Sequence, residues 1–252
     1  MRAFLCILAA LAFTATAAVA APPGLVEPML HIAPGGQAGP RVALTFDACM
    51  GKSDMRIISA LVENRLPATI FVTARWLKHN PAVFEELKSH PDLFEIENHG
   101  AMHVPAVDRP GKVYGIATAG SPEAVAKEVE GGATALVQSG ASKPAWFRGS
   151  TARYSRSSIA QIRKLGYRVA GYSVNGDGGS LLGARSAEKQ IAGAKDGDVV
   201  IAHINQPGHA AGGGVVKGIL DLKARGYSFV KLADVAAEGS DDTTRTPDAP
   251  GY

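Results

Sequence analysis

The amino-acid sequence predicts an α/β fold, a barrel of parallel strands. Short apolar or β-branched runs alternate with longer runs whose apolar residues recur at helical spacing, which is the pattern of β/α units. There are about seven such units, a number that suits a barrel better than a small sandwich. A doubly wound open sheet is the alternative, but it carries a glycine-rich phosphate-binding turn after its first strand. The segment DACMGK (47–52) is not such a turn.

The predicted strands are short, rich in β-branched or aromatic residues, and separated from the helices by turn residues. In chain order they are 42–46, 68–73, 93–98, 144–149, 167–174, 198–204 and 228–232. The predicted helices begin at capping residues or at a proline, and several end at glycine. They are 53–62, with Ser53 as its N-cap, then 81–90, 121–137, 155–166, 186–195 and 214–226. The long stretch 104–120 is a candidate rim for a site.

The first residues have the composition of a secretory signal peptide. An apolar run over 4–13 follows Arg2, and the small-residue cleavage site Ala18-Val19-Ala20 comes after it. The run is too short to span a bilayer, so we expect an exported protein, periplasmic or secreted, without a stable membrane anchor. An uncleaved anchor is the alternative. The predicted organisation is a signal peptide (1–20), an extended leader (21–40), one folded domain (41–237) and a disordered tail (238–252).

Charge and cysteine content argue against a nucleic-acid-binding protein and against a disulfide-stabilised one. The formal net charge is +3 over 252 residues, whereas nucleic-acid-binding proteins usually show a concentrated basic patch. Once the signal peptide is removed, Cys49 is the remaining cysteine, and a single thiol cannot form an internal disulfide. We therefore expect the fold to depend on its apolar core.

Polar residues follow the predicted strands at the ends where a parallel barrel carries its active site. In chain order they are Asp47, Asn98 with His99, Arg148, Asn175 with Asp177, and His203. Any one of them is explained as a solvated strand end. Their recurrence at one face of one architecture predicts a catalytic site.

The motif HGAMH places His99 and His103 four residues apart. On one helical turn, side chains at this spacing share a face and can bind one metal ion. Imidazole nitrogens suit zinc, copper, nickel or iron. Because Gly100 occupies the glutamate position of H-E-x-x-H, the pair is not the protease zinc motif.

Taken together, the motifs of this chain resemble those of the polysaccharide deacetylases, the NodB-homology or carbohydrate esterase 4 family. They are LTFDA (44–48), ENHGAMH (97–103), WFRGST (146–151), YSVNGDGG (172–179) and VIAH (200–203). The resemblance covers about residues 41–236 and implies a distorted (β/α) barrel. It also implies a hydrolase of carbon–nitrogen bonds other than peptide bonds, which removes acetyl groups from a chitin-, peptidoglycan- or xylan-like carbohydrate.

Carried over position by position, the resemblance makes Asp47 the general base, Arg148 the residue that orients it, and His203 the general acid. His99 and His103 match the family's two metal-binding histidines. The implied cofactor is a divalent metal, zinc first, with cobalt or nickel as alternatives. Backbone donors near Thr151 would stabilise the tetrahedral oxyanion.

The chain departs from the family where the metal is held. Ala48 replaces the second aspartate of T-F-D-D, the family's metal ligand. The third ligand would then be water, a substrate oxygen, Asp47 or another residue. Cys49 is a candidate that we rank below water, because strand alternation need not aim it inward.

Other departures concern the acid and the arginine motif. Asn175 replaces an aspartate that tunes the acid histidine, so we expect His203 to titrate lower, since a neighbouring negative charge is lost. Asp177 is a candidate substitute. The residues after Arg148 lack the proline and aromatic of the family's R-x-P-Y.

Two other functions stay open at this point. One is a metal-independent amidohydrolase of the same fold, which the loss of the ligand aspartate favours. The other is a catalytically inactive barrel that binds glycan through aromatic faces, for which Trp76, Trp146, Tyr154 and Tyr172 are candidates.

Overall fold

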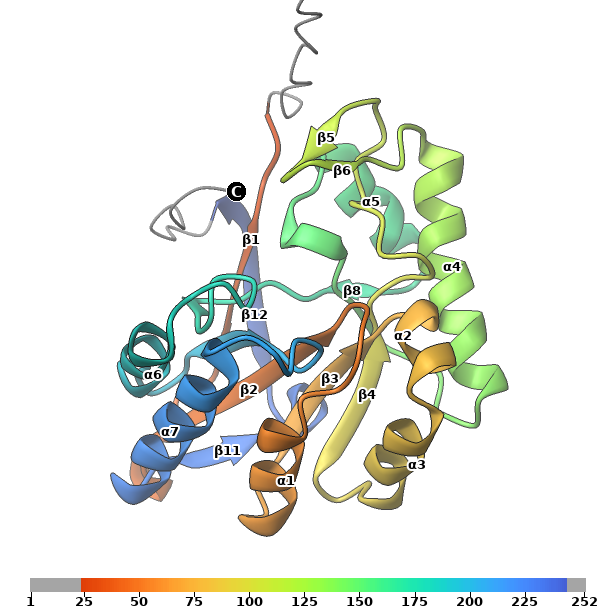
Figure 1. Ribbon diagram of the computed structural model, residues 1–252. Helices are drawn as coiled ribbons and strands as arrows, with labels where there is room; N and C mark the ends of the chain where they lie inside the picture. The colour runs from red at the N-terminus through yellow and green to blue at the C-terminus, as the bar shows by residue number, and fades with distance from the viewer. Residues whose placement is uncertain (1–23, 244–252) are drawn as a thin grey trace, which may run out of the picture.

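Parallel strands form a curled sheet at the centre of the protein, with helices packed around it (Figure 1). The computed structural model describes residues 24–243. Hydrogen-bonded neighbours follow the order β8-β7-β4-β3-β2-β10-β9, and β11 pairs with β2 outside this path. Every pair in this sheet is parallel, so the prediction of a distorted α/β barrel with about seven strands is confirmed as a half-barrel. The strands are β2 (Arg41–Ala48), β3 (Ala68–Val72), β4 (Phe94–Asn98), β7 (Trp146–Phe147), β8 (Arg168–Val169), β9 (Val174–Asn175), β10 (Val199–His203) and β11 (Ser228–Val230).

The helices begin at a capping side chain or a proline in most cases. Thr73, Ser121 and Ser155 cap α2, α4 and α5 by accepting a hydrogen bond from a backbone N–H three residues further on. The helices are α1 (Met55–Glu63), α2 (Ala74–His79), α3 (Pro81–Ser89), α4 (Pro122–Gln138), α5 (Arg156–Lys164), α6 (Ala184–Ala192) and α7 (Ala211–Ala224).

Two local expectations differ from the structure. The N-cap of α1 is Asp54, whose carboxylate accepts from the Arg56 N–H. Ser53, the predicted cap, instead donates its hydroxyl proton to Asn80 Oδ1 at 2.9 Å. The short helix α2 was not predicted, because its cap, Thr73, reads as the last residue of a β-branched strand.

Alternate side chains of β2 face opposite layers of the core. Its even-numbered residues belong to the large apolar cluster between the sheet and the helices: Val42, Leu44, Phe46 and Ala48. Ala43 belongs to the second cluster, with Phe71 and Ile201 inside the half-barrel. Asp47 is an even number of residues from Ala43, so its side chain points to the same, inner face of the sheet. Its carboxylate lies there at the end of β2.

The ends of the sheet are joined by one extended stretch, 168–175, predicted as a single strand (167–174). It begins as β8 beside β7 and ends as β9 beside β10. Between them it bonds to β1 (Pro28–Ile32): Tyr172 N–H donates to the Pro28 carbonyl at 3.3 Å, and Leu30 N–H donates to the Tyr172 carbonyl at 3.4 Å. Gly171 permits this approach, because a Cβ there would lie 2.0 Å from the Pro28 carbonyl oxygen. β1 therefore seals the seam of the half-barrel.

β1 comes from the predicted leader (21–40), so the described part of this segment, 24–40, belongs to the fold. β12 (Ala237–Thr243) pairs with β1 in antiparallel fashion. The structure thus differs from the predicted disordered tail over 238–243, because pairing with an available strand edge uses backbone groups and needs no apolar side chains. The rest of that tail (244–252) and the predicted signal peptide (1–20) lie outside the described residues. Within residues 24–243, no helix has the length and apolar content to cross a membrane.

We expect Gly171→Ala to lower the free energy of unfolding by about 1–3 kcal/mol, the usual cost of overpacking, because the added methyl group displaces β1. Gly208→Ala is the matched control, since a Cβ at that position meets nothing within 4 Å. Urea denaturation followed by circular dichroism measures both variants. Equal stabilities would contradict the role of β1 in sealing the seam.

Candidate active site

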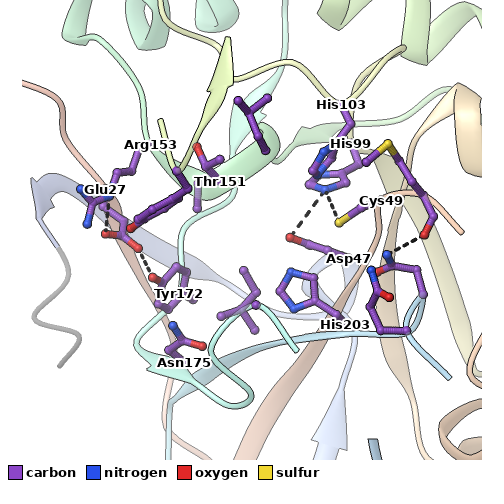
Figure 2. A pocket seen from close by; sticks show the side chains of 18 residues that line it. Glu27, Asp47, Cys49, His99, His103, Thr151, Arg153, Tyr172, Asn175 and His203 are labelled. Atoms are coloured by element: carbon purple, nitrogen blue, oxygen red, sulfur yellow. Dashed lines mark hydrogen bonds and ion pairs between the residues drawn. The ribbon is translucent and has the colours of Figure 1, made fainter. Parts of the chain in front are cut away.

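Parallel pairing aligns the strand-end residues singled out in the sequence. His203 of β10 lies opposite Asp47 of β2 in the strand register. His99 directly follows β4, and Arg148 directly follows β7. Asp47, His99, His103 and His203 line one cavity of about 280 Å³ (Figure 2). The structure therefore brings the predicted site residues together, with Arg148 buried beneath the cavity.

Arg148 is fully buried and holds Asp47 in place. Its Nη1 donates to Asp47 Oδ1 at 3.0 Å. Its Nη2 and Nε donate to the backbone carbonyls of Gly171 at 3.0 Å and Ala170 at 3.4 Å. The guanidinium thus connects the end of β2 to the seam between β8 and β9.

Asp47 is ionised in this setting. Burial alone would raise the pKa of its carboxyl group, but the positive charges of His99, Arg148 and His203 hold the pKa below its ordinary value. The second carboxylate oxygen, Oδ2, lies 3.7 Å from His99 Nε2. Asp47 therefore gives one oxygen to Arg148 and turns the other toward the histidines.

His99 and His103 lie close together, but in a loop, so the prediction of one helical turn is wrong. Positive φ angles at Gly100 (92°) and His103 (64°) turn the chain back on itself. The two rings lie 5.2 Å apart between centroids. Cys49 joins them, with its Sγ 3.4 Å from His99 Nε2. The chain therefore does aim this side chain inward, which removes the reason for ranking it below water.

A buried glutamate on α4, missed in the sequence analysis, shapes the histidine loop. The Glu128 carboxylate accepts hydrogen bonds from the backbone N–H groups of Met102 at 3.0 Å and Val104 at 3.1 Å. Gly100 passes directly over it, and a Cβ at Gly100 would lie 2.4 Å from Glu128 Oε1. The sequence around Glu128 is an ordinary helical pattern, so it does not indicate that the carboxylate accepts hydrogen bonds from a loop more than twenty residues away.

Asp177, not Asn175, is the acidic partner of His203. Asp177 Oδ1 lies 2.9 Å from His203 Nδ1, and its Oδ2 accepts from the His203 backbone N–H at 2.7 Å. Asn175 accepts from the Gly178 N–H at 2.8 Å and so shapes the turn that carries Asp177. Burial alone would lower the pKa of His203, but Asp177 raises it well above its ordinary value. The expectation that His203 titrates lower is therefore wrong.

The other end of the cavity contains residues that the sequence analysis did not assign to a site (Figure 2). Glu27, directly before β1, is buried, accepts a hydrogen bond from the Tyr172 hydroxyl and lies 3.6 Å from Arg153 Nε. The Thr151 hydroxyl oxygen is buried and has no hydrogen-bond partner among the described residues. Glu27 could not be found from sequence, because only the closure of the seam by β1 brings it here.

The predicted rim, 104–120, also reaches the cavity. It contains a small antiparallel hairpin of β5 (Lys112–Val113) and β6 (Ile116–Ala117). Tyr114, in the hairpin turn, and Ile116 line the cavity. The hairpin therefore forms part of the wall on the side of Glu27 and Arg153.

The cluster of Cys49, His99 and His103 fits a divalent metal ion. The atoms these residues could offer as ligands lie within 4.8 Å of one another. Two imidazoles and a thiolate form a donor set that suits zinc, and cobalt or nickel less commonly. Burial would raise the pKa of the Cys49 thiol, but the charges of His99 and His103 lower it well below its ordinary value. The thiolate form, which metals bind, is therefore favoured.

Comparison with known families gives one match. The model of the family described as polysaccharide deacetylase matches residues 35–170, more than half of the 252-residue chain. The matched segment contains Asp47, His99 and Arg148, and it ends before β10, which carries His203. No protein with a curated description matches the chain.

Solved structures share the fold at low sequence identity. A CE4-family pseudoenzyme from Bacillus anthracis is 17% identical with a TM-score of 0.64, covering 86% of this chain and 69% of that one. PdaA of Bacillus subtilis, a family 4 carbohydrate esterase, is 20% identical with a TM-score of 0.62, covering 80% and 82%. A family 4 carbohydrate esterase from Streptomyces lividans, in complex with acetate, is 19% identical with a TM-score of 0.59, covering 76% and 92%. These likenesses confirm the fold that the motifs implied.

We expect Asp177→Asn to lower the pKa of the His203 imidazole, because the carboxylate no longer outweighs burial. A raised histidine pKa stabilises the folded protein below the unfolded-state value of about 6.5, and this stabilisation is lost as pH rises through the folded-state pKa. The stability gap between wild type and variant should therefore be largest in acid and shrink at higher pH.

Nuclear magnetic resonance of the imidazole nitrogens in metal-free protein measures this pKa directly. Asp221→Asn, which removes a half-exposed carboxylate from α7, is the control and should leave the titration of His203 unchanged. The same titration in wild type and Asp177→Asn would rule out Asp177 as the controlling partner.

Proposed function

This chain belongs to the polysaccharide deacetylase family, and on that premise we propose that it is a hydrolase that removes acetyl groups from an amino sugar or polysaccharide. The bond cleaved is a carbon–nitrogen amide bond that is not a peptide bond. The observation that carries the proposal is the meeting of Asp47 and His203, on adjacent strands, with His99 and His103 in one cavity. An ionised carboxylate and a protonated imidazole are the base and acid that amide hydrolysis requires.

Asp47 acts as the general base. A divalent metal held by His99 and His103, zinc first and cobalt or nickel as alternatives, would supply Lewis-acid activation of water and of the acetyl oxygen. Asp47 Oδ2 accepts the proton of the attacking water, while Arg148 keeps Oδ1 and so fixes the direction of the carboxylate. Arg148 is thus a positioning residue, since it acts through Asp47.

His203 acts as the general acid. Its raised pKa keeps the ring protonated near neutral pH, and Asp177 holds Nδ1, which leaves Nε2 to give its proton to the departing amine. The buried Thr151 hydroxyl, which has no partner in the described part of the chain, is available to hydrogen-bond an oxygen of the substrate.

The substrate is a carbohydrate of the chitin or peptidoglycan kind, whose acetyl groups are amides, whereas those of xylan are esters. The far end of the cavity supports this, because Glu27, Arg153 and Tyr172 offer acceptors and donors suited to sugar hydroxyl and amide groups. Tyr114, which is 42% exposed, adds aromatic surface on which a sugar ring can lie. With the predicted signal peptide, this substrate class indicates an enzyme that acts after export, in the periplasm or outside the cell.

One observation favours a second candidate, an inactive glycan-binding barrel. Ala48 lacks the family's ligand carboxylate, and one protein of similar fold, from Bacillus anthracis, is a pseudoenzyme. The intact set of base, acid and positioning arginine favours the hydrolase instead.

Asp47→Asn should lower the rate of acetate release by about 10²–10⁴-fold, because the amide cannot accept the proton of water. Asp92→Asn, which breaks an exposed ion pair with Arg65, is the matched control and should keep full activity. The assay measures acetate released from chitin oligomers, peptidoglycan and acetylated xylan. Circular dichroism at the assay temperature shows whether each variant is folded.

No acetate from any of these substrates with the unaltered protein, together with persistent glycan binding, would favour the inactive barrel. Full activity in Asp47→Asn would exclude Asp47 as the base.

Removing metal should abolish acetate release, and adding zinc should restore it. Purified protein is treated with EDTA, its metal content is measured, and activity is followed as zinc, cobalt or nickel is returned. The metal-independent amidohydrolase makes the opposite prediction, since it would keep full activity after chelation.

A further inference from the structure

We propose that Cys49, as a thiolate, is the third protein ligand of the metal, so that this chain holds its metal through one sulfur and two imidazole nitrogens. The inference deepens the proposed function and rests on it for the presence of a metal at this site. It concerns the position where the chain departs from its family, since Ala48 offers no carboxylate.

The backbone turns Cys49, and not Ala48, toward the cavity. Ala48 is fully buried in the apolar cluster between the sheet and the helices, together with Phe46. Cys49 directly follows β2 and lines the cavity. The Thr73 hydroxyl donates to the Cys49 carbonyl at 2.6 Å, and the Thr73 N–H donates to the Ala48 carbonyl at 3.3 Å. These two bonds hold the backbone of Ala48 and Cys49 in place and so keep the Cys49 side chain directed into the cavity.

His99 is held in the orientation that a metal ligand requires. Its Nδ1 lies 2.6 Å from the backbone carbonyl of Arg148. Because a carbonyl only accepts, Nδ1 carries a proton, so Nε2 is the ring nitrogen that gives up its proton when a metal binds. Nε2 is the atom that lies 3.4 Å from Cys49 Sγ. Nε2 and the sulfur therefore face the same space before any ion is bound.

The spacing of the cluster suits one tetrahedral ion. With metal–ligand bonds of about 2.0–2.3 Å, a tetrahedral zinc site keeps its ligand atoms roughly 3.3–3.6 Å apart. The candidate ligand atoms of Cys49, His99 and His103 all lie within 4.8 Å of one another. Ser150 Oγ, 3.3 Å from His103 Nδ1, supports the second ring. Small side-chain movements are enough to complete the site.

Asp47 is a poorer third ligand than Cys49. Its Oδ1 is bound by Arg148, and its remaining oxygen is the one that the proposed reaction uses. A sulfur donor leaves this carboxylate free for proton transfer. It also favours zinc or cobalt over hard ions such as magnesium and manganese, which prefer oxygen.

Cobalt substitution tests the proposal without an activity assay. Full-length protein stripped of metal is titrated with Co²⁺ and followed by absorption spectroscopy. We expect an intense near-ultraviolet sulfur-to-cobalt charge-transfer band that saturates at one equivalent. Cys49→Ser should abolish the band and weaken cobalt binding by more than about 100-fold, the upper end of what outer-shell changes cost. His79→Gln, which removes an exposed imidazole from the end of α2, is the matched control and should keep the band.

A second variant covers the case in which Cys49→Ser does not fold. Cys49→Asp supplies a carboxylate from the same position, so it should bind cobalt without the charge-transfer band. Stoichiometric cobalt binding by wild type with no such band would overturn the inference, as would unchanged affinity in Cys49→Ser. A Cys49-dependent band in a protein that releases no acetate would keep the sulfur ligand and remove the proposed function. Metal-dependent acetate release by a protein without the charge-transfer band would keep the proposed function and exclude the sulfur ligand.

Discussion

The buried ion pair between Arg148 and Asp47 is the interaction on which the rest of the site depends. Both side chains are almost wholly removed from solvent, where a charge without a partner is costly, and removing one member of such a pair costs about 3–5 kcal/mol. Arg148 also donates to the carbonyls of Gly171 and Ala170 in the seam, and its own carbonyl accepts from His99. One residue therefore fixes the proposed base Asp47, the proposed metal ligand His99 and the closing segment of the half-barrel.

This arrangement separates two tasks that one carboxylate could not perform together. In the proposed mechanism, Arg148 holds Asp47 as an ionised group for proton transfer, and the cluster of Cys49 with the two histidines is left to hold the metal. The proposed acid, His203 at the end of the neighbouring strand β10, has its own partner in Asp177. Opposite charges alternate through the buried region, so each is stabilised by its neighbour.

The sequence was most informative where periodicity and parallel register decide position. The sheet and the convergence of Asp47, His99, Arg148 and His203 follow from strands whose ends must meet at one edge. It was least informative where distant backbone segments meet. The role of Asp177 depends on the turn after β9, and the position of Glu27 depends on β1 crossing the seam. Cys49 shares the inward direction of Asp47 because the alternation of β2 continues one residue past its end, where the Thr73 hydroxyl bonds the Cys49 carbonyl.

The most direct test of the central claim, that Arg148 reserves Asp47 for proton transfer while sulfur helps to hold the metal, is a crystal structure of the zinc-loaded protein measured at the zinc absorption edge. The account predicts one zinc ion bound by Cys49, His99 and His103, with the Asp47 carboxylate still paired to Arg148. Zinc bound by Asp47 with that ion pair broken, or zinc bound away from these histidines, would contradict it.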